Sequence, residues 1–542
     1  MKFRFEFRAV SGSLWVSTVA TVRGFPPLRD SAIGGRLWIA AFHPRTQTES
    51  FQVNILLATS EAVPFAKTGG LGDVCGALPV ELARLGHNTA VILPYYRKAR
   101  YCGQPIEPLG IDFIVPIGSK TVTGHLLAGK LPRSDVPVYL VRQDQYFDRE
   151  ELYGEDGQDY DDNCERFVFF SRAVMETIRL LELDVDVIHA NDWQTGLVPA
   201  YLTTEYGGLP RYKSIACLFA LHNMAYQGRF WHWDMLLTGL DWKYFNWHQM
   251  EYHGKLNLLK TGLVFADAIN AVSPRYAQEI QTAQFGCGLE GVLRQRRDIL
   301  TGILNGVDYG VWDPAVDPVL AANYDCDSVA TGKPKCKAAL QDELGLPRRP
   351  DTPLVGMIGR LDRQKGFDLV ADVMPEWVET TDLEWVILGT GDPDYEARFR
   401  ALAERFPKKV AARLEFSDDL AHKIEAGADI FLMPSRYEPC GLNQMYSLKY
   451  GTVPVVRDTG GLADTIVDAS DQTLADGTAN GFSFQEDNCQ ALDETLQRAR
   501  DAYRRPDVWR QLVRTGMQQD WSWARSARQY VELYQQITAR KN

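Results

Sequence analysis

Short apolar runs alternate with longer amphipathic stretches along the chain from residue 51 onward. In the first half, the runs VNILLATS, TAVILPYY, VPVYLVR and VDVIHAND are rich in β-branched residues and predict strands. Between such runs lie segments with helical spacing, for example RFVFFSRAVMETIRLL. Because strands that alternate with helices usually form parallel sheets, this pattern predicts βαβ units.

A second alternation begins near residue 352, after a connector that starts at about residue 299. Its predicted strands are PLVGMIGRL, LEWVILGTG, RLEFS, ADIFLMPS and VPVVRDTGG. The sequence therefore predicts an α/β protein with two Rossmann-like, doubly wound domains, at residues 51–298 and 299–520. Ligands of such sheets bind beyond the carboxyl ends of the strands, so we expect the site in a deep cleft that the two domains face.

The last segment, residues 521–542, has the spacing of an amphipathic helix. One face of this helix carries five apolar or aromatic residues: Trp523, Ala527, Tyr530, Tyr534 and Ile537. We expect this helix to cross back and pack on the N-terminal domain.

Composition excludes some partners. The chain has 542 residues, and its 70 acidic against 58 basic side chains give a net charge of -12. Nucleic acid and anionic membranes are therefore not expected as partners, since both need a basic surface. No apolar run approaches the roughly 18 residues that span a bilayer. Nine dispersed cysteines without a CxxC pair indicate reduced thiols and a cytoplasmic location.

Residues 1–50 differ from the rest, with seven Lys or Arg, three acidic residues and the half-apolar patch AVSGSLWVSTVA. One interpretation is a disordered leader of uncertain role. The other is a transit peptide, which would place the protein in a plastid.

The stretch AKTGGLGDVCGALP, residues 66–79, predicts a turn between a strand and a helix. Lys67 precedes two glycines of this turn, Gly69 and Gly70. The stretch matches neither G-x-G-x-x-G nor the P-loop pattern. The glycines either serve a left-handed turn for backbone reasons or let the turn approach an anion.

The second half repeats this chemistry. Arg360 and Lys365 flank the start of a predicted helix, and Thr459, Gly460 and Gly461 lie at another strand-to-helix turn. Arginine offers a bidentate fork to a phosphate and lysine a point charge. Three such turns in an acidic chain favour a cleft for a nucleotide diphosphate.

Glu438 follows the predicted strand ADIFLM and precedes a predicted helix. Its carboxylate either caps that helix or binds the hydroxyls of a sugar, beside the N–H groups of Cys440, Gly441 and Leu442. Cys440 as a nucleophile is disfavoured, because no Cys–His–Asn arrangement surrounds it.

Six motifs in order carry a family resemblance from about residue 53 to the end. They are KTGGLGDVCGALP, DWQTGLVPAYL, LHNMAYQG, LNGVD, GRLDRQKGFDL and SRYEPCGLNQMYSLKYGTVPVVRDTGGLADT. Together they resemble bacterial glycogen synthases and plant starch synthases. The resemblance implies the GT-B fold and retaining transfer of glucose from ADP-glucose to the 4-hydroxyl at the non-reducing end of an α-1,4-glucan. It implies no cofactor and no metal.

The resemblance also implies roles. Lys67 and its glycine turn, Arg360 and Lys365 would hold the donor diphosphate. His222 would lie against the transferred glucose, and Glu438 would bind its hydroxyls. The resemblance places further residues near the donor, the glucose or the acceptor: Asp73, Tyr153, Asp192, Asn223, Asn305 and, at the adenine, Phe416.

Three positions depart from related patterns. Many bacterial members read HAHDWH where this chain reads HANDWQ, so Asn191 and Gln194 replace two histidines on the acceptor side. Glucan affinity or length preference would then differ, while transfer survives. Eight residues after Glu438, where the wider retaining class often has a second glutamate, this chain has Tyr446, which disfavours a double displacement.

Two other functions share the architecture. One is a catalytically silent glucan-binding or scaffold protein; the presence of Lys67, His222, Arg360, Lys365 and Glu438 disfavours it. The other is an α-glucan phosphorylase, but no lysine environment for pyridoxal phosphate is evident. The sequence leaves open whether ADP- or UDP-glucose is preferred, whether the product is glycogen or starch, and whether the chain forms a homo-oligomer.

Overall fold

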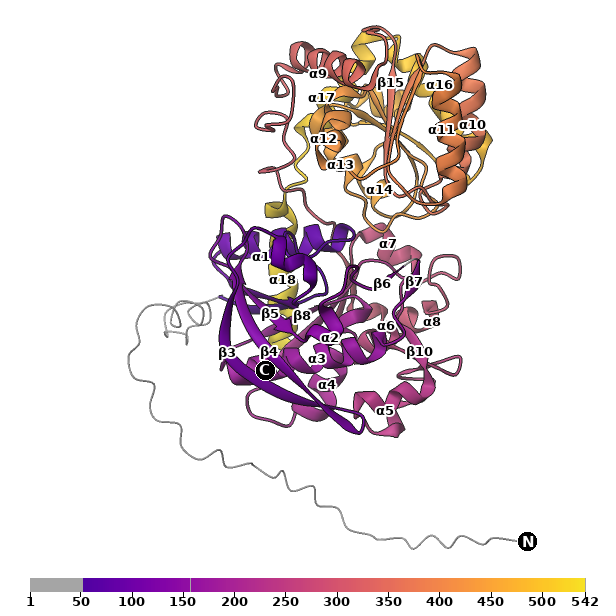
Figure 1. The fold of residues 1–542 in the computed structure, drawn as a ribbon. Coiled ribbons are helices and arrows are strands. Elements are labelled where there is room, and N and C mark those ends of the chain that lie inside the picture. Colours follow the sequence, from indigo (N-terminus) through magenta and orange to yellow (C-terminus); the bar gives the residue numbers. More distant parts are fainter. Residues whose placement is uncertain (1–51, 156, 542) are drawn as a thin grey trace, which may run out of the picture. The chain divides into compact units, whose positions relative to one another are not determined.

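A computed structural model describes residues 52–155 and 157–541. The leader predicted at residues 1–50 lies outside these described residues. Within them, the strands form two large sheets that follow one another along the chain (Figure 1).

The first sheet has nine strands in the described part of the chain, in the order β14-β13-β9-β8-β1-β2-β5-β4-β3. Their bounds are β1 (Asn54–Ala58), β2 (Asn88–Pro94), β3 (Glu107–Ile117), β4 (Lys120–Lys130), β5 (Pro137–Arg142), β8 (Val187–Asn191), β9 (Ala216–Leu221), β13 (Ala268–Ala271) and β14 (Leu300–Gly302). The central strand β1 pairs in parallel with β2 and β8, and all five of its residues are buried. A strand buried on both faces reads as a continuous apolar run, which is why the sequence predicted it.

The β3–β4 hairpin departs from the predicted βαβ pattern. β3 pairs antiparallel with β4, and β4 antiparallel with β5. In the last five residues of β3 buried and exposed positions alternate strictly, so one face of this edge meets solvent. Such strands have no continuous apolar run, and the sequence pattern therefore missed them.

Helices and short elements connect these strands. The helices are α1 (Gly70–Arg84), α2 (Asp144–Phe147), α3 (Asn163–Leu180), α4 (Leu197–Tyr201), α5 (Met235–Thr238), α6 (Leu258–Phe265), α7 (Pro274–Glu279) and α8 (Glu290–Gln295). Two small sheets contain β6 (Gly154–Glu155) with β7 (Gln158–Asp159), and β10 (Arg229–Trp231) with β12 (Lys255–Asn257) and β11 (Glu251–Tyr252). Single turns are η1 (Arg97–Tyr101), η2 (Trp193–Thr195), η3 (Leu202–Tyr206), η4 (His232–Asp234), η5 (Trp242–Tyr244) and η6 (Arg297–Ile299).

The second sheet is parallel throughout, in the order β17-β16-β15-β18-β19-β20. Its strands are β15 (Leu354–Ile358), β16 (Glu384–Leu388), β17 (Val410–Arg413), β18 (Ile430–Met433), β19 (Val453–Arg457) and β20 (Phe482–Phe484). The sequence predicted β17 at RLEFS, residues 413–417, but the strand lies at Val410–Arg413. Val410 and Ala411 are buried against β16, whereas Glu415 and Phe416 are exposed.

Helices cover both faces of the second sheet. They are α9 (Val329–Leu344), α10 (Phe367–Thr380), α11 (Pro393–Arg405), α12 (Asp418–Gly427), α13 (Asn443–Tyr450), α14 (Gly460–Thr465), α15 (Asp471–Ala475), α16 (Cys489–Tyr503) and α17 (Pro506–Gln518). α10, α11 and α16 lie on one face, and α12, α13 and α17 on the other (Figure 1). This doubly wound arrangement confirms the predicted fold class.

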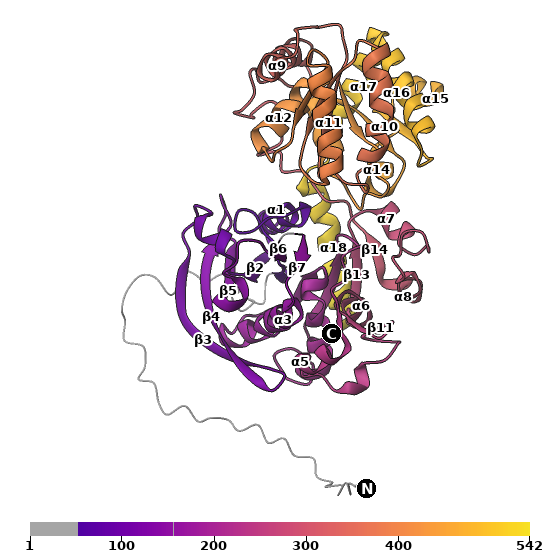
Figure 2. The ribbon, with the colours of Figure 1, turned by 45° about the vertical axis from the view of Figure 1, so that its right-hand side comes forward.

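The C-terminal helix α18 (Trp523–Lys541) returns to the first sheet, as predicted (Figure 2). All five residues of the predicted apolar face are buried. Two tyrosines of this face also make buried hydrogen bonds: Tyr534 with His189 of β8 at 2.8 Å, and Tyr530 with Asn270 of β13 at 2.9 Å. Burial of each such aromatic side chain stabilises the fold by about 1.5–3 kcal/mol. The buried face therefore stabilises the packing of α18 on the first sheet. Among the described residues, no helix is both long and apolar enough to cross a membrane.

Candidate active site

The glycine turn between β1 and α1 is organised by a buried carboxylate, Glu61. Its oxygens accept hydrogen bonds from the Thr68 backbone N–H at 2.6 Å, the Thr68 hydroxyl at 2.7 Å and the Gly69 N–H at 3.2 Å. The hydroxyl of Tyr153, a predicted site residue, donates to the same carboxylate at 2.7 Å. The sequence reasoning missed Glu61, although an acidic residue directly after an apolar strand was the available signal.

Each of the three predicted phosphate-binding cations is paired with a carboxylate. The pairs are Lys67 Nζ with Asp73 at 2.8 Å, Arg360 Nε with Asp362 at 2.5 Å, and Lys365 Nζ with Glu438 at 2.6 Å. These bonds orient each cation. An anionic ligand would therefore compete with carboxylates that already neutralise part of the charge.

Glu438 lies in the loop after β18, with 5% of its surface exposed. Its Oε2 accepts from Lys365 and, at 3.0 Å, from the Ser435 hydroxyl. The following helix, α13, begins at Asn443 with Leu442 as its N-cap, so Glu438 does not occupy the capping position. The carboxylate thus lies beside a cation, at the carboxyl end of a parallel strand.

Cys440 and Gly441 shape the next part of this loop. Gly441 has φ of 71°, in the left-handed region that a residue with a Cβ rarely adopts. Burial raises the pKa of the Cys440 thiol to about 12, so this side chain is a neutral thiol. A neutral, buried thiol is not a nucleophile, which agrees with the sequence interpretation.

His222 and Asp192 come from two neighbouring parallel strands. β8 and β9 pair in register, with Asn191 opposite Ala220, so the loops that follow them meet. Asp192 accepts a hydrogen bond from the His222 backbone N–H at 2.8 Å. Burial raises the pKa of Asp192 to about 7, and the backbone N–H bonds oppose that shift. Asp192 therefore fixes the backbone that carries His222.

Asn191 determines which nitrogen of His222 carries the proton. Its Nδ2 donates to the backbone carbonyls of Ala58 and His189, both at 3.1 Å, so its Oδ1 faces His222 Nε2 at 3.0 Å. An amide oxygen can only accept, and His222 Nε2 must therefore be the N–H. Burial also lowers the pKa of His222 to about 4, so the ring is neutral at neutral pH and Nδ1 is an acceptor.

The turn at Thr459 and Gly460 already holds a carboxylate. Glu279, at the end of α7, accepts from the Gly460 N–H at 3.1 Å and from the Thr459 hydroxyl at 3.2 Å. The Gly461 N–H donates to the Glu438 backbone carbonyl at 3.1 Å. In this structure these groups therefore bind protein acceptors and link α7 to α14.

Three further predicted site residues, Asn223, Asn305 and Phe416, lie on other loops. Asn223 accepts from the Tyr437 hydroxyl at 3.4 Å, so it lies beside the loop that contains Glu438. The backbone of Asn305 hydrogen-bonds the Cys440 sulfur. Phe416 lies on the loop after β17 with 79% of its surface exposed, and no ring contact with the described residues holds it.

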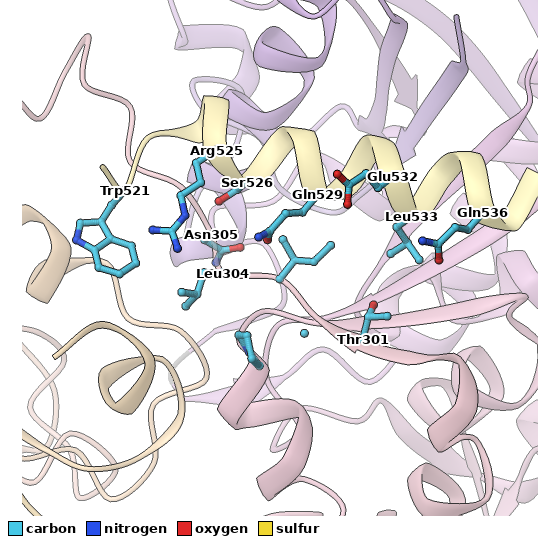
Figure 3. Close-up of a pocket in the computed structure, with 13 residues that line it drawn as sticks. Thr301, Leu304, Asn305, Trp521, Arg525, Ser526, Gln529, Glu532, Leu533 and Gln536 are labelled. Atoms are coloured by element: carbon cyan, nitrogen blue, oxygen red, sulfur yellow. The ribbon is translucent and has the colours of Figure 1, made fainter. Parts of the chain in front are cut away.

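A cavity of about 350 Å³ lies between β14, residues 303–305 and α18 (Figure 3). Asn305 is the predicted site residue that lines it, and the Asn305 Oδ1 has no partner in the described part of the chain. The three predicted cations and Glu438 do not line this cavity, so it is separate from the candidate site that they form. Residues 52–155 and 157–541 contain no group of three or more His, Cys, Asp or Glu side chains placed to hold a metal ion.

Comparison with known proteins defines the class first. Residues 344–511 match the family described as glycosyl transferases group 1. The catalytic domain of starch synthase IV from Arabidopsis thaliana, solved with ADP and acarbose, superposes with a TM-score of 0.83 at 33% identity, covering 90% of this chain and all of that one. A sucrose-phosphate synthase from Thermosynechococcus elongatus shares the fold at a TM-score of 0.54 and 17% identity. The protein is a glycosyltransferase with the GT-B fold.

The family within this class follows from the sequence matches. Residues 54–295 match the starch synthase catalytic domain. The glycogen synthase of Rhodopirellula baltica is 47% identical over 493 residues, which cover 89% of this chain and 97% of that protein. The glycogen synthase of Syntrophotalea carbinolica is 48% identical over 482 residues, or 89% and 98% of the two chains. The chain belongs to the family of bacterial glycogen synthases and plant starch synthases.

Proposed function

We propose that the protein transfers glucose from ADP-glucose to the 4-hydroxyl at the non-reducing end of an α-1,4-glucan, with retention of configuration. The observation that carries this proposal is the set of cations and carboxylates around Glu438, in a chain whose relatives are named glycogen synthases. A relative solved with ADP and acarbose supports the same two substrates.

In this proposal, the donor diphosphate displaces the carboxylates from Lys67, Arg360 and Lys365. When the bond to glucose breaks, negative charge grows on the departing ADP. Cations fixed around the diphosphate then stabilise the transition state more than the ground state. The chain's own side chains supply this charge, so we propose that neither a metal nor a cofactor takes part.

Glu438 and His222 would hold the transferred glucose. Once Lys365 turns to the diphosphate, the Glu438 carboxylate is free to accept hydrogen bonds from sugar hydroxyls. The neutral His222 ring presents Nδ1 as a further acceptor and adds no positive charge beside a glucosyl group that becomes cationic. Both features favour the transition state.

Retention through a covalent glucosyl intermediate would need a carboxylate nucleophile, as in retaining glycosidases. The residue eight positions after Glu438 is Tyr446, whose ring stacks on Trp312 at 3.9 Å. We therefore propose that ADP leaves and the acceptor attacks on the same face of the sugar. The departing phosphate would take the proton of the acceptor hydroxyl.

The compartment we propose is the cytoplasm. All nine cysteines are free thiols in the structure, and five of them are buried. Such a set is typical of a reducing compartment.

The test is transfer of radiolabelled glucose from ADP-glucose and, in parallel, from UDP-glucose to glycogen and to maltotetraose. We expect ADP-glucose to label both acceptors and the label to be released by an α-1,4-specific glucosidase. Lys365→Ala serves as the control with a damaged site. A protein that binds glycogen but incorporates no label from either donor would instead be a silent glucan-binding protein.

A further inference from the structure

Four tryptophans between residues 231 and 247 lie on the protein surface. Their exposed fractions are 62% for Trp231, 49% for Trp233, 41% for Trp242 and 71% for Trp247. Leu236, in the same segment, is 57% exposed. Tryptophan is among the most buried residues on average, and a cluster of exposed large apolar side chains usually marks a binding surface.

The rings form a row along β10, η4 and η5. The centroids of Trp231 and Trp233 lie 6.5 Å apart at 69°, those of Trp233 and Trp242 5.4 Å apart at 40°, and those of Trp242 and Phe245 5.1 Å apart at 38°. The rings are tilted and do not stack face to face, so they leave area open to solvent. We call Trp231, Trp233 and Trp242 the tryptophan row.

The backbone beneath the row is held in place. Thr238, at the end of α5, accepts at its carbonyl from Arg172 at 2.5 Å and from Tyr201 at 2.8 Å, and both donors are buried in the first sheet's helices. Asp241 accepts from the Lys243 N–H at 2.9 Å and so caps η5. The exposure of the rings is therefore a property of a folded segment.

Strand β10 connects the tryptophan row to the candidate active site. β10 begins just after the loop that carries His222. On this strand Phe230 packs on Trp193 of the HANDWQ loop, with centroids 5.7 Å apart, and Trp193 lies 6.5 Å from Tyr153. Because neighbouring residues of a strand point to opposite faces, Trp231 points outward where Phe230 points inward. The same strand thus joins the predicted acceptor side to the row.

The charge of this surface suits a neutral ligand. Residues 229–248 contain two basic side chains, Arg229 and Lys243, and two acidic ones, Asp234 and Asp241. The segment is therefore neutral in a chain of net charge -12, and it lacks the excess of cations that draws proteins to anionic membranes.

We propose that the tryptophan row binds an α-1,4-glucan chain outside the active site. The apolar C–H faces of successive glucose units pack on the tilted rings, and the flanking carboxylates accept hydrogen bonds from sugar hydroxyls. The inference rests on the proposed function, in which this glucan is the acceptor. A polymer held at the row keeps its chain ends at high local concentration near the site, which raises apparent affinity for long glucans only.

The experiment compares wild type with the triple variant Trp231→Ala/Trp233→Ala/Trp242→Ala. Tyr101→Ala is the matched control, because Tyr101 is 81% exposed and lies outside the row. Electrophoresis through gels that contain glycogen, without ADP-glucose, measures binding alone. We expect the triple variant to bind glycogen about tenfold more weakly, with an unchanged thermal melt, whereas the control behaves like wild type.

Kinetics give a second readout. With glycogen as acceptor, KM should rise about tenfold in the triple variant, while kcat and the KM for maltotriose stay within about twofold. Unchanged retardation by glycogen would overturn the proposal. So would a wild-type dimer that the triple variant converts to a monomer, or wild-type binding to phosphatidylserine vesicles that the variant loses. The gel measurement needs no turnover, so it decides the proposal even if the transfer assay fails.

Discussion

Replacing Glu438 by glutamine should strengthen the binding of ADP while it abolishes most of the turnover. Lys365 pairs with Glu438 through a contact of 2.6 Å. A diphosphate would compete with this carboxylate for the positive charge of Lys365. The neutral amide of glutamine holds Lys365 less strongly and also removes a negative charge that repels the diphosphate.

The size of the effect follows from the burial of the pair. The side chain of Lys365 is 29% exposed and that of Glu438 is 6% exposed. Exposed ion pairs contribute up to about 1 kcal/mol, and breaking a buried pair costs about 3–5 kcal/mol. The burial of the Lys365–Glu438 pair lies between these two cases. In the variant the amide oxygen of glutamine still accepts from Lys365, so only part of the interaction is lost. We therefore expect a gain of about 0.7–1.4 kcal/mol, or roughly 3- to 10-fold tighter ADP binding.

Isothermal titration with ADP measures this gain directly. Glu404→Gln, an exposed glutamate on α11, controls for the loss of one negative charge in the same part of the chain. Turnover of Glu438→Gln with ADP-glucose should fall at least about 100-fold, since the charged acceptor for the sugar hydroxyls is gone. Weaker or unchanged ADP binding in Glu438→Gln would refute the idea that this carboxylate and the diphosphate compete for Lys365.

Three further predictions concern other parts of the site. Arg360→Ala and Lys365→Ala should each cost about 2–5 kcal/mol of transition-state binding and so lower kcat/KM by about 30- to several-thousand-fold. Steady-state rates within about threefold of wild type for both variants would contradict the proposal that these cations hold the diphosphate. Asn191→Asp places an anion beside His222 Nε2 and should raise the His222 pKa from about 4. On the acid side of the pH–rate profile, activity should then be lost at a higher pH than in wild type, because the ring protonates earlier. An unchanged acid side of the profile would count against the proposal that His222 acts as a neutral ring. Glu61→Gln should lower the free energy of unfolding by about 1–3 kcal/mol, because a glutamine whose oxygen faces the Thr68 and Gly69 N–H groups must turn its NH2 toward the Thr68 and Tyr153 hydroxyls, which donate to the carboxylate. Urea denaturation checks this, and a loss under about 0.5 kcal/mol would show that the turn does not depend on the carboxylate.

Much of the fold could be predicted because its central strands are buried on both faces. Such strands read as apolar runs, as β1 and β18 do, whatever lies around them. The β3–β4 hairpin could not be found in this way, since polar residues such as Asp112 and Thr123 alternate with its apolar positions. β17 was misplaced because Phe416, which extends the apparent run, faces solvent.

The residue types of the candidate site could be picked out from the sequence, but the pairs that these residues form could not. Lys365 and Glu438 are 73 residues apart, and nothing local to either indicates that they meet. The same holds for Glu279, which reaches Gly460 across 181 residues. A turn rich in glycine suggests a free anion site, yet only the fold shows that a carboxylate of the chain already lies there.

Each predicted phosphate-binding cation is paired with a carboxylate of the chain, and this pairing affects which anions the site would select. An empty site with three bare cations would attract any anion, and the cost of burying those charges would be high. In this protein Asp73, Asp362 and Glu438 neutralise the cations in advance, so a monoanion gains little by replacing one carboxylate with another charge of the same size. A diphosphate carries several negative charges on one group and so gains more from a set of cations than a monoanion does. Under the proposed function, the three carboxylates would therefore disfavour small anions, and Glu438 would in addition bind the sugar hydroxyls.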